Sequence, residues 1–141
     1  MPVNVGAPIN TAGNEFYPSV TASGNLYFTG QRETGAGNED IFRAVMEDGR
    51  WSRIENIGPG VNTEGYEFNA FVAADESYII FSSQRGRDDE LGGGDLYISR
   101  KGDSGEFEKA TQLSGPINCV EPRATVRSFM TGSCTSQVDA R

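Results

Sequence analysis

The chain of 141 residues contains no histidine. Imidazole is the commonest general base and a frequent metal ligand, so its absence excludes the histidine-dependent catalytic triads. Only two cysteines are present, Cys119 and Cys134, whereas a structural zinc site needs four ligands. A disulfide between them would contribute about 3 kcal/mol by restricting the unfolded chain, and two free thiols are an open alternative. We therefore predict a protein that is not an enzyme and has no catalytic cofactor.

Long apolar runs and an excess of basic residues are also missing. No apolar run reaches the roughly 18 residues that a membrane-spanning helix needs, so we expect no membrane insertion. The 12 basic and 20 acidic residues give a net charge of −8. This charge disfavours nucleic-acid phosphates as partners. Residues 1–10 lack the basic segment and the apolar core of a secretory signal, so we expect no signal peptide.

Glycine and short aromatic runs dominate what is present. The 18 glycines accompany little helical periodicity, and the aromatic residues stand in short alternating segments. This pattern favours an all-β class, and the length favours a single domain over residues 1–141.

The chain also repeats itself. The matching pairs run from Glu15 and Glu67, 52 residues apart, to Trp51 and Phe107, 56 residues apart. Between these ends, Gln31-Arg32 returns as Gln84-Arg85, and Asp40 returns as Asp95. A period near fifty residues that is filled with short strands is typical of a propeller or a similar array.

Each repeat contains four segments that resemble strands, which is the composition of one antiparallel propeller blade. The expected strands cover residues 15–20, 25–30, 40–45 and 51–56 in the first unit, and residues 67–73, 78–83, 95–99 and 107–112 in the second. We expect blade one over 15–56, blade two over 67–112, and a degenerate third unit or cap over 113–141. For this last part, a strand that completes a neighbouring blade and a truncated reading frame are open alternatives.

The long connections are expected at one end of the sheets, because turns alternate between the two ends of a meander. Residues 31–40, 57–67 and 84–95 form this long-loop end, and loops on a rigid scaffold carry most binding residues. We predict that a protein or a glycan binds there. The candidate ligand-binding residues are Arg32, Arg85, Glu67, Asn62 and Tyr66.

Two of these predictions have structural alternatives. Arg32 and Arg85 each close a second strand, and Asp40 and Asp95 each open a third. This repeated Arg–Asp set is also consistent with a salt bridge or turn bond that restrains the long loop of each unit. A glycine-rich acidic cluster is a weak candidate for Ca²⁺, which binds carboxylate oxygens, and a solvated loop is the alternative. Its members are Asp88, Asp89, Glu90 and Asp95.

The strings "NLYFTGQR…NEDIF", "YIIFSSQRGRDDELGGGDLY" and "IGPGVNTEGYE" resemble the TolB-type, WD-repeat-like β-propeller repeats of bacterial cell-envelope proteins. The resemblance covers about residues 5–118. It implies a periplasmic or cell-envelope scaffold for protein contacts, often joined to peptidoglycan-binding modules. It also implies an alternative, a propeller detached from a hydrolase or peptidase. No catalytic residue of that family belongs to the repeat itself.

Two blades do not make a complete propeller, since such folds use about four to eight. The outer faces of the two blades would expose a larger apolar patch than a monomer usually tolerates. We therefore expect a homo-oligomer that completes a ring, or a fragment of a longer propeller.

Overall fold

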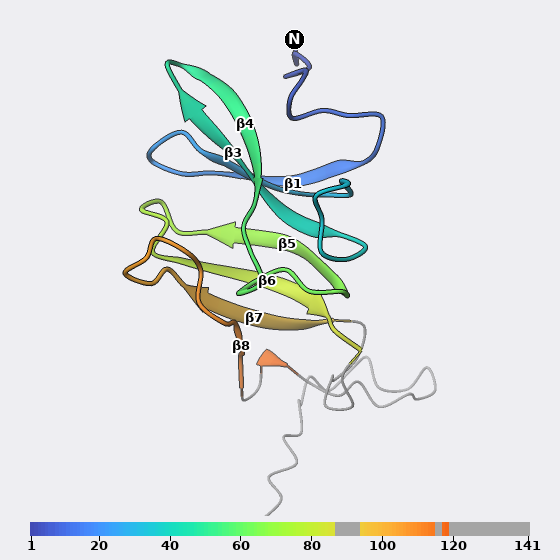
Figure 1. Ribbon diagram of the computed structural model, residues 1–141, viewed down its shortest axis with the longest axis vertical. Coiled ribbons are helices and arrows are strands. Elements are labelled where there is room, and N and C mark those ends of the chain that lie inside the picture. The colour runs from blue at the N-terminus through green and yellow to red at the C-terminus, as the bar shows by residue number, and fades with distance from the viewer. Residues whose placement is uncertain (87–93, 115–116, 119–141) are drawn as a thin grey trace, which may run out of the picture.

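The computed structural model describes residues 1–86, 94–114 and 117–118, and their regular structure consists of two four-stranded antiparallel sheets (Figure 1). Sheet one contains β1 (Glu15–Val20), β2 (Leu26–Gly30), β3 (Asp40–Glu47) and β4 (Arg50–Asn56). Sheet two contains β5 (Tyr66–Val72), β6 (Tyr78–Gln84), β7 (Asp95–Arg100) and β8 (Thr111–Gln112). The strands of each sheet follow one another in chain order. The prediction of an all-β class is confirmed, and within the described residues no helix has the length and apolar character to cross a membrane.

Seven of the eight expected strands match an observed strand to within two residues at each end. The prediction for the eighth is wrong over residues 107–110, because β8 contains only Thr111–Gln112. Part of this segment bonds outside its own sheet: the backbone N–H of Ala110 donates to the carbonyl oxygen of Gly60, at 2.8 Å. Phe107 keeps only an isolated bridge to Lys101.

Backbone conformation repeats along with sequence. Tyr17 in β1 and Asn69 in β5 have φ angles of 54° and 55°, and each lies at an irregularity in the pairing with the next strand. An extra residue at such a β-bulge bends its strand and increases the local twist. Asp48 and Gly49 also have positive φ angles, 50° and 76°. This pair forms the two-residue hairpin turn that the sequence predicts between β3 and β4.

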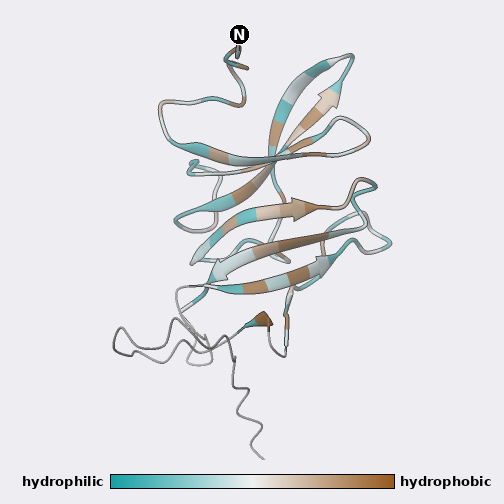
Figure 2. Cartoon of the chain, turned by 180° about the vertical axis from the view of Figure 1, so that it is seen from behind, coloured by the Kyte–Doolittle hydropathy of each residue, from teal (hydrophilic) through white to brown (hydrophobic). Residues whose placement is uncertain are grey.

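The two sheets stack face to face, as Figure 1 shows. Along β6 and β7, buried residues alternate with half-buried ones, as expected where successive side chains point to opposite faces. Figure 2 shows the hydropathy of both sheets from behind. We call the two faces that meet the proximal faces, and the two that point away from each other the distal faces. The core between the proximal faces contains Tyr27, Ile41, Val61, Ala70, Val72, Ile79, Phe81, Tyr97, Phe107 and Ala110.

A second, smaller core lies on the distal face of sheet one and is formed mostly by side chains of that sheet. Ile9, from the segment before β1, packs there against Leu26, Phe28 and Phe42. The short turns of both sheets lie on one side of the stack, and the β2–β3 loop and the β4–β5 link lie on the other (Figure 1). This arrangement places the predicted long-loop end on a single side of the molecule.

Candidate functional site

At the long-loop end, Glu67 is the second residue of β5, an edge strand of sheet two, and is fully buried, with an exposed fraction of 0%. The backbone N–H of Thr63 donates to its Oε2 at 2.8 Å, and the Thr63 hydroxyl donates to its Oε1 at 2.7 Å. The Ser83 hydroxyl also donates to Oε1, at 2.7 Å. Arg85 Nε lies 3.6 Å from the same oxygen. The carboxylate is therefore satisfied within the chain and ties the 57–66 link to β6.

We call Glu67 and the residues that bind its carboxylate the Glu67 clamp. Sheet one contains an equivalent clamp around Glu15. Glu15 accepts hydrogen bonds from the backbone N–H and the hydroxyl of Thr11, and Arg32 lies 3.6 Å away. Each arginine also lies over two aromatic rings of its own sheet, a favourable cation–π arrangement. The guanidinium carbon of Arg85 is 4.4 Å from the ring centroid of Tyr97, and that of Arg32 is 5.1 Å from the ring centroid of Phe28. Two copies of one internally bonded clamp indicate a structural role.

Asn62 anchors the link between the sheets. Its Oδ1 accepts from the N–H of Ile41 at 2.9 Å, and its Nδ2 donates to the carbonyl oxygen of Ile41 at 2.8 Å. Asn118 makes the same two bonds to Leu96 of β7, at 2.8 and 3.0 Å. This asparagine therefore extends each sheet at its third strand, and only 2% of Asn62 is exposed.

Four of the five candidate binding residues therefore bond within the chain and hold the long loops in place. Arg32, Glu67, Asn62 and Arg85 all have partners within the chain. Tyr66 differs from them, because 40% of it is exposed. Ligand binding by these five residues stays a prediction.

The candidates for calcium fall mostly outside the described residues, since Asp88, Asp89 and Glu90 are not among them. Asp95 is described and is 2% exposed, and its Oδ2 accepts a hydrogen bond from Gln112 at 2.5 Å. Among residues 1–86, 94–114 and 117–118, no three acidic or cysteine side chains are grouped to hold a metal ion. The calcium site stays a prediction, as does the pairing of Cys119 with Cys134, which also lie outside these ranges.

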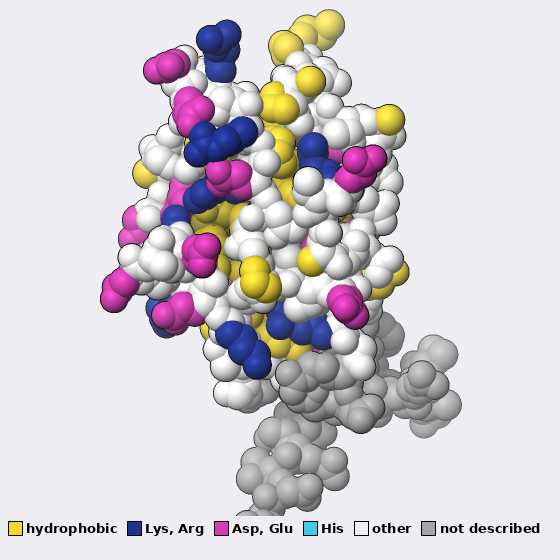
Figure 3. All heavy atoms as spheres, viewed as in Figure 1, with side chains coloured by type: hydrophobic (Ala, Val, Ile, Leu, Met, Phe, Trp, Pro, Cys, Tyr) yellow, Lys and Arg dark blue, Asp and Glu magenta, His cyan; other side chains and the backbone are white. Residues whose placement is uncertain are grey.

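Two hollows accompany the sheets. One, of about 510 Å³, is an open groove at the long-loop end, lined by Thr11, Ala12, Gly13, Gln31, Arg32, Glu33, Thr34 and Ile54. The other, of about 370 Å³, lies between the outer edges of the sheets and is lined by Arg43, residues 55–60 and residues 105–107. Figure 3 shows acidic and basic side chains interspersed over the sheet-one side of this edge. Arg53 pairs there with Glu47 and Glu55. Such exposed pairs contribute little to stability.

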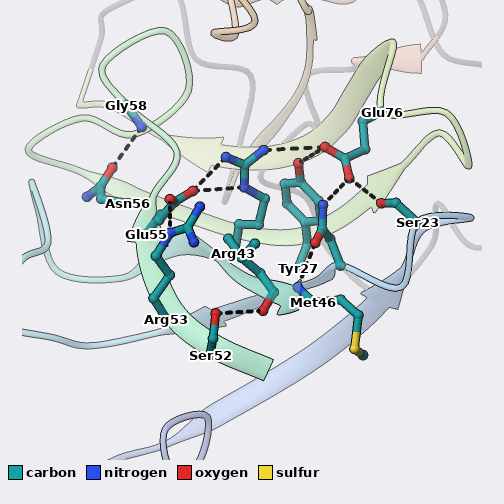
Figure 4. A network of polar contacts seen from close by, with 12 residues as sticks. Ser23, Tyr27, Arg43, Met46, Ser52, Arg53, Glu55, Asn56, Gly58 and Glu76 are labelled. Carbon is teal, nitrogen blue, oxygen red and sulfur yellow. Dashed lines mark hydrogen bonds and ion pairs between the residues drawn. The ribbon is translucent and has the colours of Figure 1, made fainter. Parts of the chain in front are cut away.

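Among the described residues, one electrostatic cluster is not predicted by the sequence. Glu76 lies in the turn between β5 and β6 and reaches across to the proximal face of sheet one (Figure 4). Its carboxylate accepts hydrogen bonds from Asn25 at 2.6 Å and from the Tyr27 hydroxyl at 2.9 Å. Lys101 of sheet two donates at 2.8 Å. We call these residues, together with Arg43, the Glu76 latch.

The latch sets the ionisation of its members. Burial raises the pKa of Glu76, but hydrogen bonds from Lys101, Asn25 and Tyr27 outweigh it and lower that pKa to about 2. Burial also raises the pKa of the Tyr27 phenol, and the neighbouring Glu76 carboxylate raises it further. Arg43 lies 3.4 Å from Glu76 and 2.6 Å from Glu55. The latch is therefore an ionised cluster that joins the two sheets at the short-turn side.

One difference between the two clamps makes a testable prediction. Arg85 Nε donates to the Ser83 hydroxyl at 2.9 Å, whereas the equivalent Arg32 Nε is buried without a partner. Gly30 occupies the position of Ser83 in sheet one, and a Cβ there would meet its nearest neighbour, the carbonyl oxygen of Asn14, at an ordinary 3.5 Å. We expect Gly30→Ser to raise the free energy of unfolding by about 1 kcal/mol, measured by urea denaturation.

The matched control for this prediction is Gly30→Ala. Alanine gives the same reduction in backbone freedom of the unfolded chain but has no hydroxyl. The serine variant should therefore exceed the alanine variant in stability. Equal stabilities of the two variants would contradict the proposed bond to Arg32.

Comparison with known proteins adds no family assignment to this geometry. No model of a protein family matches the chain, and no curated protein matches it. The resemblance to TolB-type repeats stays a prediction.

Proposed function

We propose that the chain is a non-enzymatic, propeller-type binding module that holds a protein or a glycan at its long-loop end. The observation that carries this proposal is the repeated anchoring of the long loops. The Glu67 clamp and the Asn62 anchor fix the link that leads to Tyr66. The backbone N–H of Glu67 also donates to the carbonyl oxygen of Glu39, at 2.8 Å, which joins this link to the long loop of sheet one.

Rigid loops with exposed polar and aromatic groups suit recognition more than chemistry. Preorganisation lowers the entropy that a binding surface loses when a partner docks. Tyr66 offers an aromatic ring with a polar hydroxyl, a group that is enriched at protein interfaces. The net charge of −8 disfavours a nucleic acid at this surface.

The test is binding of the purified chain to a glycan array that includes soluble peptidoglycan fragments, followed by titration calorimetry on any ligand found. We expect Tyr66→Ala to weaken binding by about 30-fold, the effect of truncating an aromatic hot spot. Tyr17→Ala is the matched control, because Tyr17 is 53% exposed but lies within β1, outside the long loops. Equal losses in the two variants, or unchanged binding in Tyr66→Ala, would contradict the proposal for glycans.

A protein partner is tested with the same two variants. A partner captured from the native host should bind the wild-type chain and the Tyr17 variant equally and the Tyr66 variant more weakly. A partner that does not distinguish the two variants binds elsewhere on the chain.

A further inference from the structure

Among the described residues, no sheet packs on the distal face of sheet one, whereas the equivalent face of sheet two, its proximal face, packs on sheet one. Val20 and Val72 hold equivalent positions, five residues after Glu15 and Glu67. Val72 is packed against sheet one and is 4% exposed, whereas Val20 is 61% exposed. Pro18 is exposed in the same way, and its counterpart Ala70 is 2% exposed. These exposures differ because sheet one packs on the proximal face of sheet two, whereas no sheet among the described residues packs on the distal face of sheet one.

The part of the chain that the structure describes also places no sheet on the distal face of sheet two. Ile41 of sheet one is fully buried against sheet two, but its counterpart Leu96 is half-buried. Phe71 is 55% exposed, and its ring lies 6.3 Å from the half-buried Tyr78 ring. In sheet one the position of Phe71 is held by Ser19, whose hydroxyl accepts a hydrogen bond from the Val72 N–H. Sheet two therefore presents a more apolar surface than the corresponding face of sheet one.

The positions equivalent to the charged members of the Glu76 latch are uncharged on both distal faces. At the internal interface, sheet two contributes Glu76 and Lys101, which lie 2.8 Å apart. Sheet one has Gly24 and Met46 at the equivalent positions, and a Cβ on Gly24 would lie 3.0 Å from Met46 Cγ. Gly24 and Glu76 both have positive φ and both donate to the carbonyl oxygen three residues before, so their equivalence is structural.

The residues that face Glu76 across the interface also differ between the two sheets. Within sheet one, Asn25, Tyr27 and Arg43 receive the Glu76 carboxylate. The residues of sheet two at the positions of Asn25, Tyr27 and Arg43 are Tyr78, Ile80 and Ile98. Where the carboxylate is absent from one distal face, its polar partners are therefore absent from the other. Burying a charge without its partner is strongly destabilising. A contact between these two faces avoids this cost, because it buries no unpaired member of the latch.

We propose that the distal face of sheet one in one copy packs on the distal face of sheet two in a second copy. The contact repeats the internal sheet-to-sheet interface in an apolar form. It joins two different surfaces, so it assembles copies head to tail, either into a closed ring or into an open chain. This proposal concerns the sheet faces and does not depend on ligand binding at the long-loop end.

The links before β1 and after β8 are compatible with such a contact. Both contain the dipeptide Ile-Asn, at Ile9-Asn10 and Ile117-Asn118. Asn118 bonds to the backbone of Leu96 in β7, and Ile117 is 56% exposed. Asn10, the counterpart of Asn62, instead donates to the side chain of Asn4 at 2.7 Å. In the assembly, the position beside Leu96 is occupied either by Ile117-Asn118 of one copy or by Ile9-Asn10 of the next. The two dipeptides supply the same side chains.

The test begins with the mass of the full chain in solution, measured by light scattering after size exclusion. We expect a multiple of 15.2 kDa, fixed for a ring and increasing with concentration for an open chain. Val20→Arg and Phe71→Arg each place a charge in one half of the interface, and each should weaken association by at least about 100-fold. Thr34→Arg, at an exposed position in the β2–β3 loop, is the matched control and should assemble like the wild type.

Mixing the two interface variants distinguishes this assembly from all symmetric alternatives. The Phe71 variant keeps an intact distal face on sheet one, and the Val20 variant keeps an intact distal face on sheet two. A mixture should therefore form a capped one-to-one dimer, although each variant alone is a monomer. Formation of this dimer also shows that both variants are folded. A monomeric wild-type chain, single variants that still assemble, or a mixture that stays monomeric would each overturn the proposal.

Discussion

Glu76→Gln is expected to lower the free energy of unfolding at neutral pH by about 3 kcal/mol, as for other buried ion pairs that lose one partner. The Glu76 carboxylate is 9% exposed and accepts hydrogen bonds from both sheets. Glutamine keeps the shape but removes the charge that faces Arg43 and Lys101. The loss is measured by urea denaturation at pH 7.

The effect of Glu76 should disappear in acid. Its pKa falls from 4.5 to about 2 in the folded chain. A carboxylate whose pKa is depressed by folding stabilises the folded state above its unfolded pKa, and this contribution is lost as pH falls through the folded pKa. The difference in stability between wild type and Glu76→Gln should therefore be constant above about pH 5.5 and shrink between pH 4.5 and 2.

The control for this prediction is Glu33→Gln, since Glu33 is exposed in the β2–β3 loop. It should leave the stability within about 0.5 kcal/mol of wild type at every pH, as for most surface substitutions. The hypothesis that the latch joins the sheets fails if Glu76→Gln and Glu33→Gln have the same pH profile. Other buried carboxylates do not confuse the comparison, because they are common to all three proteins.

The repeat made most of the fold predictable. A second copy of Glu15 at Glu67 and of Asp40 at Asp95 fixed the phase of the strands, and alternation of apolar residues fixed their length. The meander order then followed from the short turns, and with it the common side for the long loops. The segment 107–112 was the exception, because Ala110 bonds to Gly60, a residue 50 positions earlier. No local pattern announces such a bond.

The candidate site was predictable only where it repeats. Recurrence of the Arg32–Asp40 set at Arg85 and Asp95 favoured a structural role. The observed clamps agree with a structural role, but the carboxylates that face the two arginines in them belong to Glu15 and Glu67. Asn62 gave no sign of its role in sequence, although the later Asn118 is a signal for it once both are seen to bind third strands. Tyr66, the fifth candidate, is 40% exposed.

The Glu76 latch shows why the rest was hidden. Glu76 is not repeated, since Gly24 stands at its position in sheet one, and it follows Asp75 in what reads as an ordinary turn. Its partner Asn25 is 51 residues away in the chain. Such a contact depends on how the two sheets are rotated and spaced, and a single sequence does not contain that information.

Spacing between the link and sheet two leads to the second large effect, which is expected for Gly60→Ala. A Cβ on Gly60 would lie 2.0 Å from the carbonyl oxygen of Phe107 and 2.7 Å from that of Glu108. Both neighbours are backbone atoms, so no side chain can rotate away. We expect the free energy of unfolding to fall by at least about 3 kcal/mol, as for severe overpacking.

Gly13→Ala is the matched control for Gly60→Ala. Its Cβ would meet its nearest neighbour, the Thr11 hydroxyl, at 3.4 Å, and we expect a change of less than about 1 kcal/mol. The clash at Gly60 also acts on the neighbouring residues of the link, because Val61 is fully buried and Asn62 holds β3. Urea denaturation should therefore show a lower midpoint for Gly60→Ala alone, and amide hydrogen exchange should show faster exchange at Ile41, whose N–H bonds to Asn62. Protection at Ile41 that equals wild type would mean that the link absorbs the methyl group without releasing its anchor.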